Sequence, residues 1–224
     1  MKPVEVRACA IIVAGGKGTR FGGKTPKQFL PLSGRPVFLW SVLAFKRVKS
    51  FKQVILVVPQ NKVSSLRGLS SKFGFEVVSG GAQRFDSVRN GLASAAAGIT
   101  HIAIHDAARP LIESDTIKRC LDTAVRSGAA IVAQPATDTI KSSAPDGTIL
   151  GTIPRSKVWL AQTPQIFERT LIDTAYRKLK KDITDDAQAV EFLKKRVKLV
   201  PGSGPNIKIT KQQDIKIAEI FLKR

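Results

Sequence analysis

The chain has 224 residues, of which 43% are hydrophobic, and this is enough for one domain with a sizeable core. Its formal net charge of +20 indicates an anionic partner. The longest apolar stretches, residues 8–14 and 54–58, are too short to cross a bilayer, and the N-terminus does not resemble a signal peptide, so we expect a soluble protein without a membrane partner. Cys9 and Cys120 lie far apart without nearby histidines, which predicts neither a disulfide framework nor a zinc site and favours a reducing cytoplasm.

Apolar runs of strand length alternate with helical patterns from Arg7 to about Ala133, which is typical of βαβ units in a mostly parallel sheet. We predict strands at residues 7–13, 53–58, 75–79, 101–105 and 129–133. Between them we predict helices at residues 36–46, 61–69, 84–97 and 115–126. The predicted fold class is therefore α/β, with a doubly wound, mostly parallel, Rossmann-like sheet.

The pattern changes after residue 134. Residues 135–141 and 148–154 alternate polar and apolar side chains around a Pro-Asp-Gly turn at 145–147, which predicts a protruding β-hairpin. Beyond it we predict helices at 168–180 and 185–194, a strand at 197–200, an extended segment at 206–210 and a closing helix that ends at 222. We expect residues 1–224 to form a single domain, with residues 134–157 as a hairpin arm within it.

A glycine-rich loop, residues 14–28, follows the first predicted strand, at the end of the sheet where open α/β folds bind ligands. Glycines there let main-chain N–H groups approach a phosphate or a base closely. The loop also carries three cations, Arg20, Lys24 and Lys27. We interpret it as a site for a polyphosphate.

Residues 18–25 formally match the P-loop pattern G-x-x-x-x-G-K-[ST]. A P-loop needs a long helix that begins at its Lys-Ser/Thr, but here Pro26 follows at once and Pro31 would end a helix within six residues. The dinucleotide fingerprint also fails, because Phe21 stands where the third glycine should be. We therefore expect neither a P-loop hydrolase nor a Rossmann dinucleotide site.

Further motifs accompany the loop in a fixed order: residues 80–88, 105–110, 138–141, 152–155, 162–165, 183–187 and 206–210. Together with the G-x-G-x-R and P-K-Q spacing of the loop, they resemble the sugar-nucleotide nucleotidyltransferases and, within them, the methylerythritol-phosphate cytidylyltransferase family. The resemblance spans nearly the whole chain. It implies transfer of a cytidylyl group from CTP to 2-C-methyl-D-erythritol 4-phosphate, a small sugar-alcohol phosphate of non-mevalonate isoprenoid synthesis, with Mg²⁺ as cofactor and release of pyrophosphate.

The resemblance also implies roles for individual residues. The catalytic cations are Arg20, Lys27 and Lys208. The nucleotide is contacted by Ala14, Gly15, Gly16, Gly18, Gly81, Ser87 and Asp106. The second substrate is contacted by Asp106, Arg109 and Thr184 and, from the hairpin arm of a partner subunit, by Thr139 and Arg155. This arrangement implies a homodimer that exchanges hairpin arms, while the motifs leave the metal ligands open.

Elementary phosphoryl chemistry gives an independent reason for the cations. Two anions must meet, and the transition state spreads negative charge over equatorial oxygens, so fixed cations and a metal ion are the groups that stabilise it. His105 adjoins Asp106, but a phosphate nucleophile is already deprotonated and needs no base, so we interpret His105 as structural. Thr184 is locally typical of a helix N-cap, with Asp185 and Asp186 in the first turn.

Two alternative functions stay open. A ribitol- or glycerol-phosphate cytidylyltransferase would share the loop, the His-Asp-Ala-Ala-Arg-Pro run and the closing Asn-x-Lys. A nucleic-acid-binding α/β module would account for the charge of +20. However, the basic residues fall in separate clusters and the chain has no RNP-like run, KH loop or zinc-finger spacing, so we do not expect nucleic acid as a partner.

Overall fold

The computed structural model describes residues 5–16, 21, 25–179, 183–202 and 204–223. Its central sheet has seven strands in the order β11-β7-β10-β6-β1-β4-β5. Their bounds are β1 Ala8–Val13, β4 Phe51–Val58, β5 Glu76–Ser79, β6 His101–Asp106, β7 Ala129–Pro135, β10 Trp159–Glu168 and β11 Lys198–Pro201. All pairs are parallel except those of β10, which runs antiparallel to both β6 and β7. The prediction of a mostly parallel sheet is confirmed.

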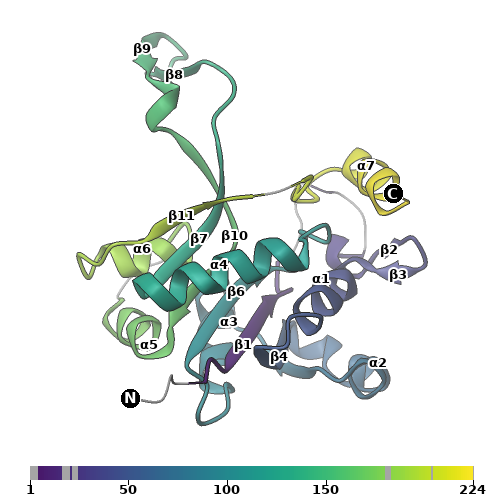
Figure 1. Ribbon diagram of the computed structural model, residues 1–224. Coiled ribbons are helices and arrows are strands. Elements are labelled where there is room, and N and C mark those ends of the chain that lie inside the picture. Colours follow the sequence, from purple (N-terminus) through teal and green to yellow (C-terminus); the bar gives the residue numbers. More distant parts are fainter. Residues whose placement is uncertain (1–4, 17–20, 22–24, 180–182, 203, 224) are drawn as a thin grey trace.

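Helices cover both faces of this sheet (Figure 1). On one face lie α1 (Val37–Lys46) and α4 (Ser114–Ser127), and on the other α3 (Arg84–Ala93), α5 (Arg169–Lys178) and α6 (Asp186–Glu191). Within β1, Ile12 faces the first layer and Ile11 the second, and both are fully buried. Burial on both faces explains why the strand is a continuous apolar run rather than an alternating one. In the part of the chain described, no helix combines the length and apolarity needed to cross a membrane.

One helix begins later than expected, and one small hairpin was missed. The α-helix predicted at residues 61–69 begins only at Arg67, where α2 (Arg67–Phe73) follows two 3-10 turns, Gln60–Lys62 and Ser64–Leu66. A minimal hairpin joins β2 (Pro31–Leu32) to β3 (Arg35–Pro36) and was not predicted. The closing helix α7 (Gln212–Leu222) packs against this hairpin in a separate apolar cluster.

The strand β10 was also missed, although it lies in the middle of the sheet. It contains Pro164 and three buried polar residues, Gln162, Thr163 and Gln165, which together read as loop rather than as a central strand. Its pairing with β7 is interrupted by a register shift between Ala161 and Gln165, and this irregularity accommodates the proline. The polar side chains are buried because they bind groups of the site described below.

The predicted hairpin is present and projects from the body of the molecule (Figure 1), but its first strand begins at Ile140 rather than at residue 135, where β7 of the central sheet ends. It consists of β8 (Ile140–Ser143) and β9 (Ile149–Ile153), which leave the sheet after β7 and return into β10. At its tip Gly147 adopts a φ of 88°, and Ala144 donates a 2.9 Å backbone hydrogen bond to Thr148. The arm exposes apolar side chains, with Ile149 at 63% and Leu150 at 69% of their full accessibility.

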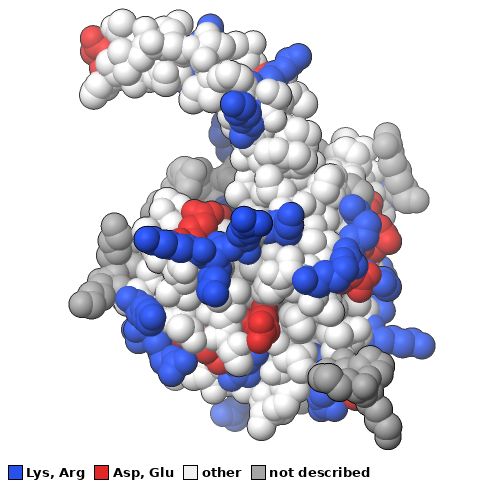
Figure 2. Space-filling view, turned by 60° about the vertical axis from the view of Figure 1, so that its left-hand side comes forward, with Lys and Arg blue, Asp and Glu red and all other residues white. Residues whose placement is uncertain are grey.

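The positive charge is spread over the surface in separate groups. Figure 2 shows lysine and arginine side chains both on the body and on the arm, with acidic side chains between some of them. On α4, for instance, Lys118 pairs with Asp122 at 2.6 Å. On the face shown in Figure 2, the basic side chains thus form separate solvated groups.

Candidate active site

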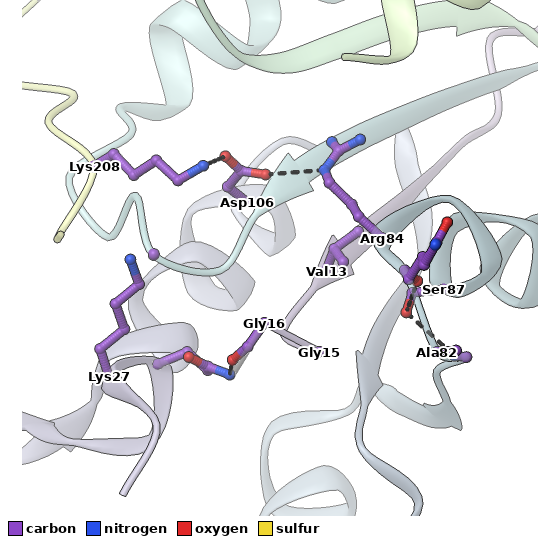
Figure 3. A pocket seen from close by; sticks show the side chains of 13 residues that line it. Val13, Gly15, Gly16, Lys27, Ala82, Arg84, Ser87, Asp106 and Lys208 are labelled. Carbon is purple, nitrogen blue, oxygen red and sulfur yellow. Dashed lines mark hydrogen bonds and ion pairs between the residues drawn. The ribbon is translucent and has the colours of Figure 1, made fainter. Parts of the chain in front are cut away.

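A cavity of about 430 Å³ lies at the carboxyl ends of β1 and β6, the position where open α/β sheets bind ligands (Figure 3). Val13 ends β1 and Asp106 ends β6, so the two strands bring the glycine-rich loop and the acidic residue to one place. The other lining residues are Gly15, Gly16, Lys27, Gln28, Gly81, Ala82, Gln83, Arg84, Ser87, Ala108 and Lys208.

Gln28 fixes the described part of the glycine-rich loop. Its side chain is only 3% exposed, and its Nε2 donates hydrogen bonds to the carbonyl oxygens of Ala14 at 2.6 Å and Gly16 at 3.0 Å. Lys27 and Gln28 belong to a 3-10 turn, Lys27–Phe29, and no long helix follows the loop. The structure thus agrees with the rejection of a P-loop.

The opposite wall of the cavity is the turn that opens α3. Gln83 is the N-cap, and its N–H donates to the Asp86 carboxylate at 3.1 Å. The Ser87 hydroxyl accepts from Gly81 N–H at 3.3 Å and donates to the Gln83 carbonyl at 3.1 Å. A Cβ at Gly81 would lie 2.2 Å from the Asp86 Cβ, so only glycine allows this turn to close. The turn presents main-chain groups and one hydroxyl to the cavity.

Asp106 is the centre of a charged cluster at the floor of the cavity (Figure 3). Its carboxylate lies 2.8 Å from Lys208 Nζ, 3.6 Å from Arg84 Nε and 3.9 Å from Arg109 Nε. Burial alone would raise the pKa of Asp106, but the positive charges of Arg84, Lys208 and Arg109 hold its pKa well below the usual range. Asp106 is therefore ionised at any physiological pH and can orient these cations.

Arg84 lines the cavity but was not among the predicted site residues. Its guanidinium binds the Asp186 carboxylate through both Nη atoms, at 3.0 and 2.6 Å, and its Nε faces Asp106. Asp186 is fully buried and also accepts a hydrogen bond from the Tyr176 hydroxyl, while the Tyr176 ring stacks on Phe85. Bidentate pairs of this kind fix the plane of the guanidinium. The partners lie 102 residues apart in the chain, so no local signal indicates the pair.

A hydrogen-bonded chain behind Asp106 holds its backbone. Thr163 Oγ1 accepts from Asp106 N–H at 3.0 Å and lies 3.0 Å from His105 Nδ1. His105 Nε2 lies 3.2 Å from the Arg109 carbonyl, which can only accept, so Nε2 carries the ring proton and the Thr163 hydroxyl donates to Nδ1. His105 is fully buried, and this geometry supports the interpretation that it is structural.

This environment predicts a pH dependence of stability. Burial lowers the pKa of His105 to about 4, so between about pH 4 and its unfolded pKa near 6.5 the unfolded chain binds a proton that the folded chain does not. Stability should therefore be complete above pH 6.5 and fall with decreasing pH, by at most about 1.4 kcal/mol per pH unit for one such group. Urea unfolding at pH 7.0, 5.5 and 4.5 measures this slope. A His105→Gln variant should show a shallower one, and an unchanged slope would contradict the assignment to His105.

The structure brings together some of the predicted site residues and not others. The cavity is lined by Gly15, Gly16, Lys27, Gly81, Ser87, Asp106 and Lys208. Ala14 and Arg109 lie directly behind it, bound to Gln28 and beside Asp106. Thr184, Thr139 and Arg155 are not among the lining residues, and the last two lie at the base of the projecting arm. Gly18 and Arg20 lie outside the described residues, as does Lys24.

The N-cap assigned to Thr184 is wrong by one residue. Asp185 is the N-cap of α6, and its Oδ1 accepts from Gln188 N–H at 3.1 Å. Thr184 is exposed, and its N–H donates to the Gln188 side chain at 3.0 Å. Asp185 takes the cap position because its other oxygen accepts a hydrogen bond from Gln165 of β10 at 2.9 Å. This bond connects the start of the helix to the sheet.

A metal site made by protein groups alone is not found in the described part of the chain, where no three His, Cys, Asp or Glu side chains are grouped to hold an ion. Asp106 is the single carboxylate among the residues lining the cavity. Mg²⁺ commonly binds through one or two carboxylates together with substrate phosphates, so the cavity fits a metal that a polyphosphate brings with it.

Several known proteins similar to this chain carry the same description. The family model of IspD, 2-C-methyl-D-erythritol 4-phosphate cytidylyltransferase, matches residues 8–224. A relative of that name from Endomicrobium trichonymphae is 49% identical over 219 residues, which are 97% of this chain and 100% of the relative. Another from Syntrophus aciditrophicus (strain SB) is 41% identical and covers 100% of this chain and 98% of its own length.

Solved structures with a similar fold carry a corresponding enzyme name. The crystal structure of 4-diphosphocytidyl-2C-methyl-D-erythritol synthase from Anaerococcus prevotii superposes with a TM-score of 0.86 and 30% identity, covering 98% of this chain and 100% of that one. A second structure described as the same synthase gives a TM-score of 0.83 at 31% identity, with the same coverage. Sequence and fold thus agree over nearly the whole length, and the chain belongs to the 2-C-methyl-D-erythritol 4-phosphate cytidylyltransferase family of CTP-dependent nucleotidyltransferases.

Proposed function

We propose that the chain transfers the cytidylyl group of CTP to 2-C-methyl-D-erythritol 4-phosphate and releases pyrophosphate. The observation that carries this proposal is the cavity itself, where a wall of main-chain groups faces Lys27, Lys208 and Asp106. A nucleotide needs a neutral, hydrogen-bonding recess for its base and fixed cations for its phosphates. The described part of this cavity offers both within one space, and the names of the relatives agree with that chemistry.

The base of the nucleotide is assigned to the turn before α3. Cytosine presents one amino donor and two acceptors along its pairing edge, which main-chain groups near Gly81 and the Ser87 hydroxyl can satisfy without a charged side chain. A Cβ at Gly80 or Gly15 would lie 2.7 or 3.2 Å from Ser87 Oγ, so glycines keep this recess open. Recognition of this kind depends on backbone position and therefore on the cap at Gln83.

The phosphates are assigned to the cationic side of the cavity. Lys27 comes from the glycine-rich loop and Lys208 from the segment after β11, so the two cations reach the cavity from different elements. A phosphate oxygen of the second substrate attacks the α-phosphorus, and the cations stabilise the charge that accumulates there. Asp106 keeps Lys208 aimed at this position, and Arg20 would add to the cations. His105 takes no part in proton transfer, because its ring is buried and bonded on both nitrogens.

We also propose Mg²⁺ as the cofactor. Asp106 is the residue that would hold it, alongside oxygens of the triphosphate. A divalent cation bound there would neutralise charge on the triphosphate and on the leaving pyrophosphate. Chelation by EDTA should then abolish turnover, and added Mg²⁺ should restore it.

The substrate assignment is tested by pyrophosphate release from CTP with each of three purified acceptors. We expect kcat/KM to be at least about tenfold higher with 2-C-methyl-D-erythritol 4-phosphate than with ribitol phosphate or glycerol phosphate, a difference that one or two lost polar contacts would produce. Comparable rates with ribitol phosphate would overturn the choice of substrate while leaving cytidylyl transfer intact. No pyrophosphate release with any acceptor would overturn the proposed function as a whole.

We further propose that the chain acts as a homodimer in which hairpin arms are exchanged. A two-stranded ribbon is marginally stable alone, and this one exposes Ile149 and Leu150 at its far end. Burial of the arm against a second copy would cover these side chains. It would also place Thr139 and Arg155 near the partner's cavity, which neither lines in its own chain.

The arm provides a prediction about assembly. Leu150→Asp places a charge on the exposed apolar surface, so the protein should sediment as a monomer and lose most of its activity. The monomer should still unfold in one cooperative transition, because Leu150 is 69% exposed within one chain and contributes little to the core of the body. Val125→Asp is the matched control, since Val125 is 42% exposed but lies on α4. A dimeric, fully active Leu150→Asp protein would argue against arm exchange.

A reducing compartment such as the cytoplasm is proposed as the location of the protein. Cys9 and Cys120 are both buried and unpaired. Burial raises the pKa of each thiol to about 12, so neither is a ready nucleophile and neither is needed as half of a disulfide.

A further inference from the structure

Lys208 reaches the cavity from a segment that has no regular secondary structure. Residues 205–210 lie between β11 and α7 and form neither helix nor strand. Even so, Lys208 Nζ lies 2.8 Å from Asp106 Oδ2. Backbone of this kind is not held by a helix or a sheet ladder, so other contacts must fix the position from which the lysine extends.

Two residues anchor the segment, one on either side of Lys208. On one side, Ile209 N–H donates to the Ala108 carbonyl at 2.8 Å. On the other, Asn206 is only 1% exposed, and its Nδ2 donates to Gln162 Oε1 at 2.8 Å and to the Thr163 carbonyl at 3.0 Å. Gln162 and Thr163 belong to β10, so the Asn206 side chain fastens the irregular segment directly to the sheet.

The backbone of Asn206 serves the same cluster. Its carbonyl oxygen accepts from Arg109 Nη1 at 2.9 Å, and Arg109 in turn lies beside Asp106. Asn206 thereby connects β10, the strand end that carries Asp106 and the segment that carries Lys208. Its Oδ1 is buried and has no hydrogen-bond partner among the described residues, so the side chain acts there through its donor nitrogen alone.

We propose that Asn206 is a positioning residue that holds Lys208 in place for phosphoryl transfer, acting through Gln162 and the backbone of β10. The inference rests on the proposed function. Asn206 does not line the cavity, so its effect reaches the reacting phosphates only through the residues it holds. It should therefore change the rate of the chemical step more than the affinity for CTP.

The test is a double-mutant cycle on the full chain with Asn206→Asp and Lys208→Ala. Asn206→Asp keeps the shape of the side chain but replaces the donor by an acceptor that faces the oxygens of Gln162 and Thr163. Alone, it should lower kcat about tenfold with little change in KM for CTP, and in the Lys208→Ala background its effect should shrink to about twofold or less. Asn61→Asp, at an exposed position in a 3-10 turn, is the matched control and should leave kcat unchanged.

Hydrogen exchange supplies a readout that does not depend on activity. Asn206→Asp and, as a second variant, Gln162→Met should both speed exchange in the peptide covering residues 205–211, while peptides of β1 and α4 keep their protection. Full protection of 205–211 in both variants, or equal losses of kcat with and without Lys208, would overturn the proposal. If the unaltered chain itself fails to transfer cytidylyl groups, the proposed function falls, and the exchange data still decide whether Asn206 fixes the segment.

Discussion

Replacing Lys208 with alanine should lower kcat/KM for cytidylyl transfer by about a hundredfold or more, the typical cost of removing one preorganised charge that faces a transition state. Lys208 lines the cavity and is aimed by Asp106, 2.8 Å away. Lys27→Ala should cause a loss of the same order, because Lys27 reaches the same space from a different element. Initial rates of pyrophosphate release at saturating and subsaturating CTP measure both effects.

A matched control separates this role from general electrostatics. Lys216 is an exposed lysine on α7, eight positions along the chain, and Lys216→Ala should leave kcat/KM within about twofold of the parent. Lys24→Ala should cost less than either cavity lysine, whereas a P-loop hydrolase would lose all activity with it. If the Lys208→Ala enzyme were as active as the Lys216→Ala enzyme, the assignment of the phosphate site would be wrong.

Replacing Asp186 with alanine should lower the free energy of unfolding by about 3 kcal/mol, since it leaves a partly buried guanidinium and a buried hydroxyl without their acceptor. Asp186 is fully buried and binds both Nη atoms of Arg84 as well as the Tyr176 hydroxyl. In a chain of this size each kcal/mol corresponds to a fall in melting temperature of roughly 2–4 °C. Activity should fall too, because Arg84 would lose the contact that sets its orientation toward Asp106.

Two further variants serve as controls for Asp186→Ala. Asp186→Asn retains an oxygen for Arg84 and should be milder than Asp186→Ala. Asp122→Ala removes an exposed partner of Lys118 on α4 and should cost less than about 0.5 kcal/mol. If Asp122→Ala and Asp186→Ala lowered the free energy of unfolding equally in urea, burial of the Arg84–Asp186 pair would contribute nothing to stability.

The sequence was sufficient for those parts of the fold in which hydrophobic pattern and burial agree. Strands such as β1 and β4 are apolar runs buried on both faces, and the amphipathic α4 was expected within one residue at each end. The strand β10 was missed because its central residues are polar and contain Pro164. Those side chains bind partners on β6, at Asn206 and at Asp185, and no local pattern indicates these partners.

In the candidate site, too, the sequence indicates residues in local motifs but not contacts between distant residues. Residues in contiguous motifs, such as Gly81, Ser87 and Asp106, lie together in one cavity, and the nucleotide contacts that the resemblance assigns to them stay a prediction. The pairing of Arg84 with Asp186 joins positions 102 residues apart and depends on how α3 meets α6. Thr184 was given the cap position of Asp185 because the two residues are locally equivalent as caps, and only the contact with Gln165 distinguishes them.

The balance of charge around the cavity bears on how fast a substrate arrives. Near the cavity, Lys27, Arg84, Lys208 and Arg109 outnumber the carboxylates Asp106 and Asp186, so the cavity is a centre of positive potential. A triphosphate diffusing nearby is drawn toward it over roughly a Debye length, about 8 Å at physiological ionic strength. Added salt should consequently slow the encounter with CTP while leaving the subsequent bond rearrangement almost untouched.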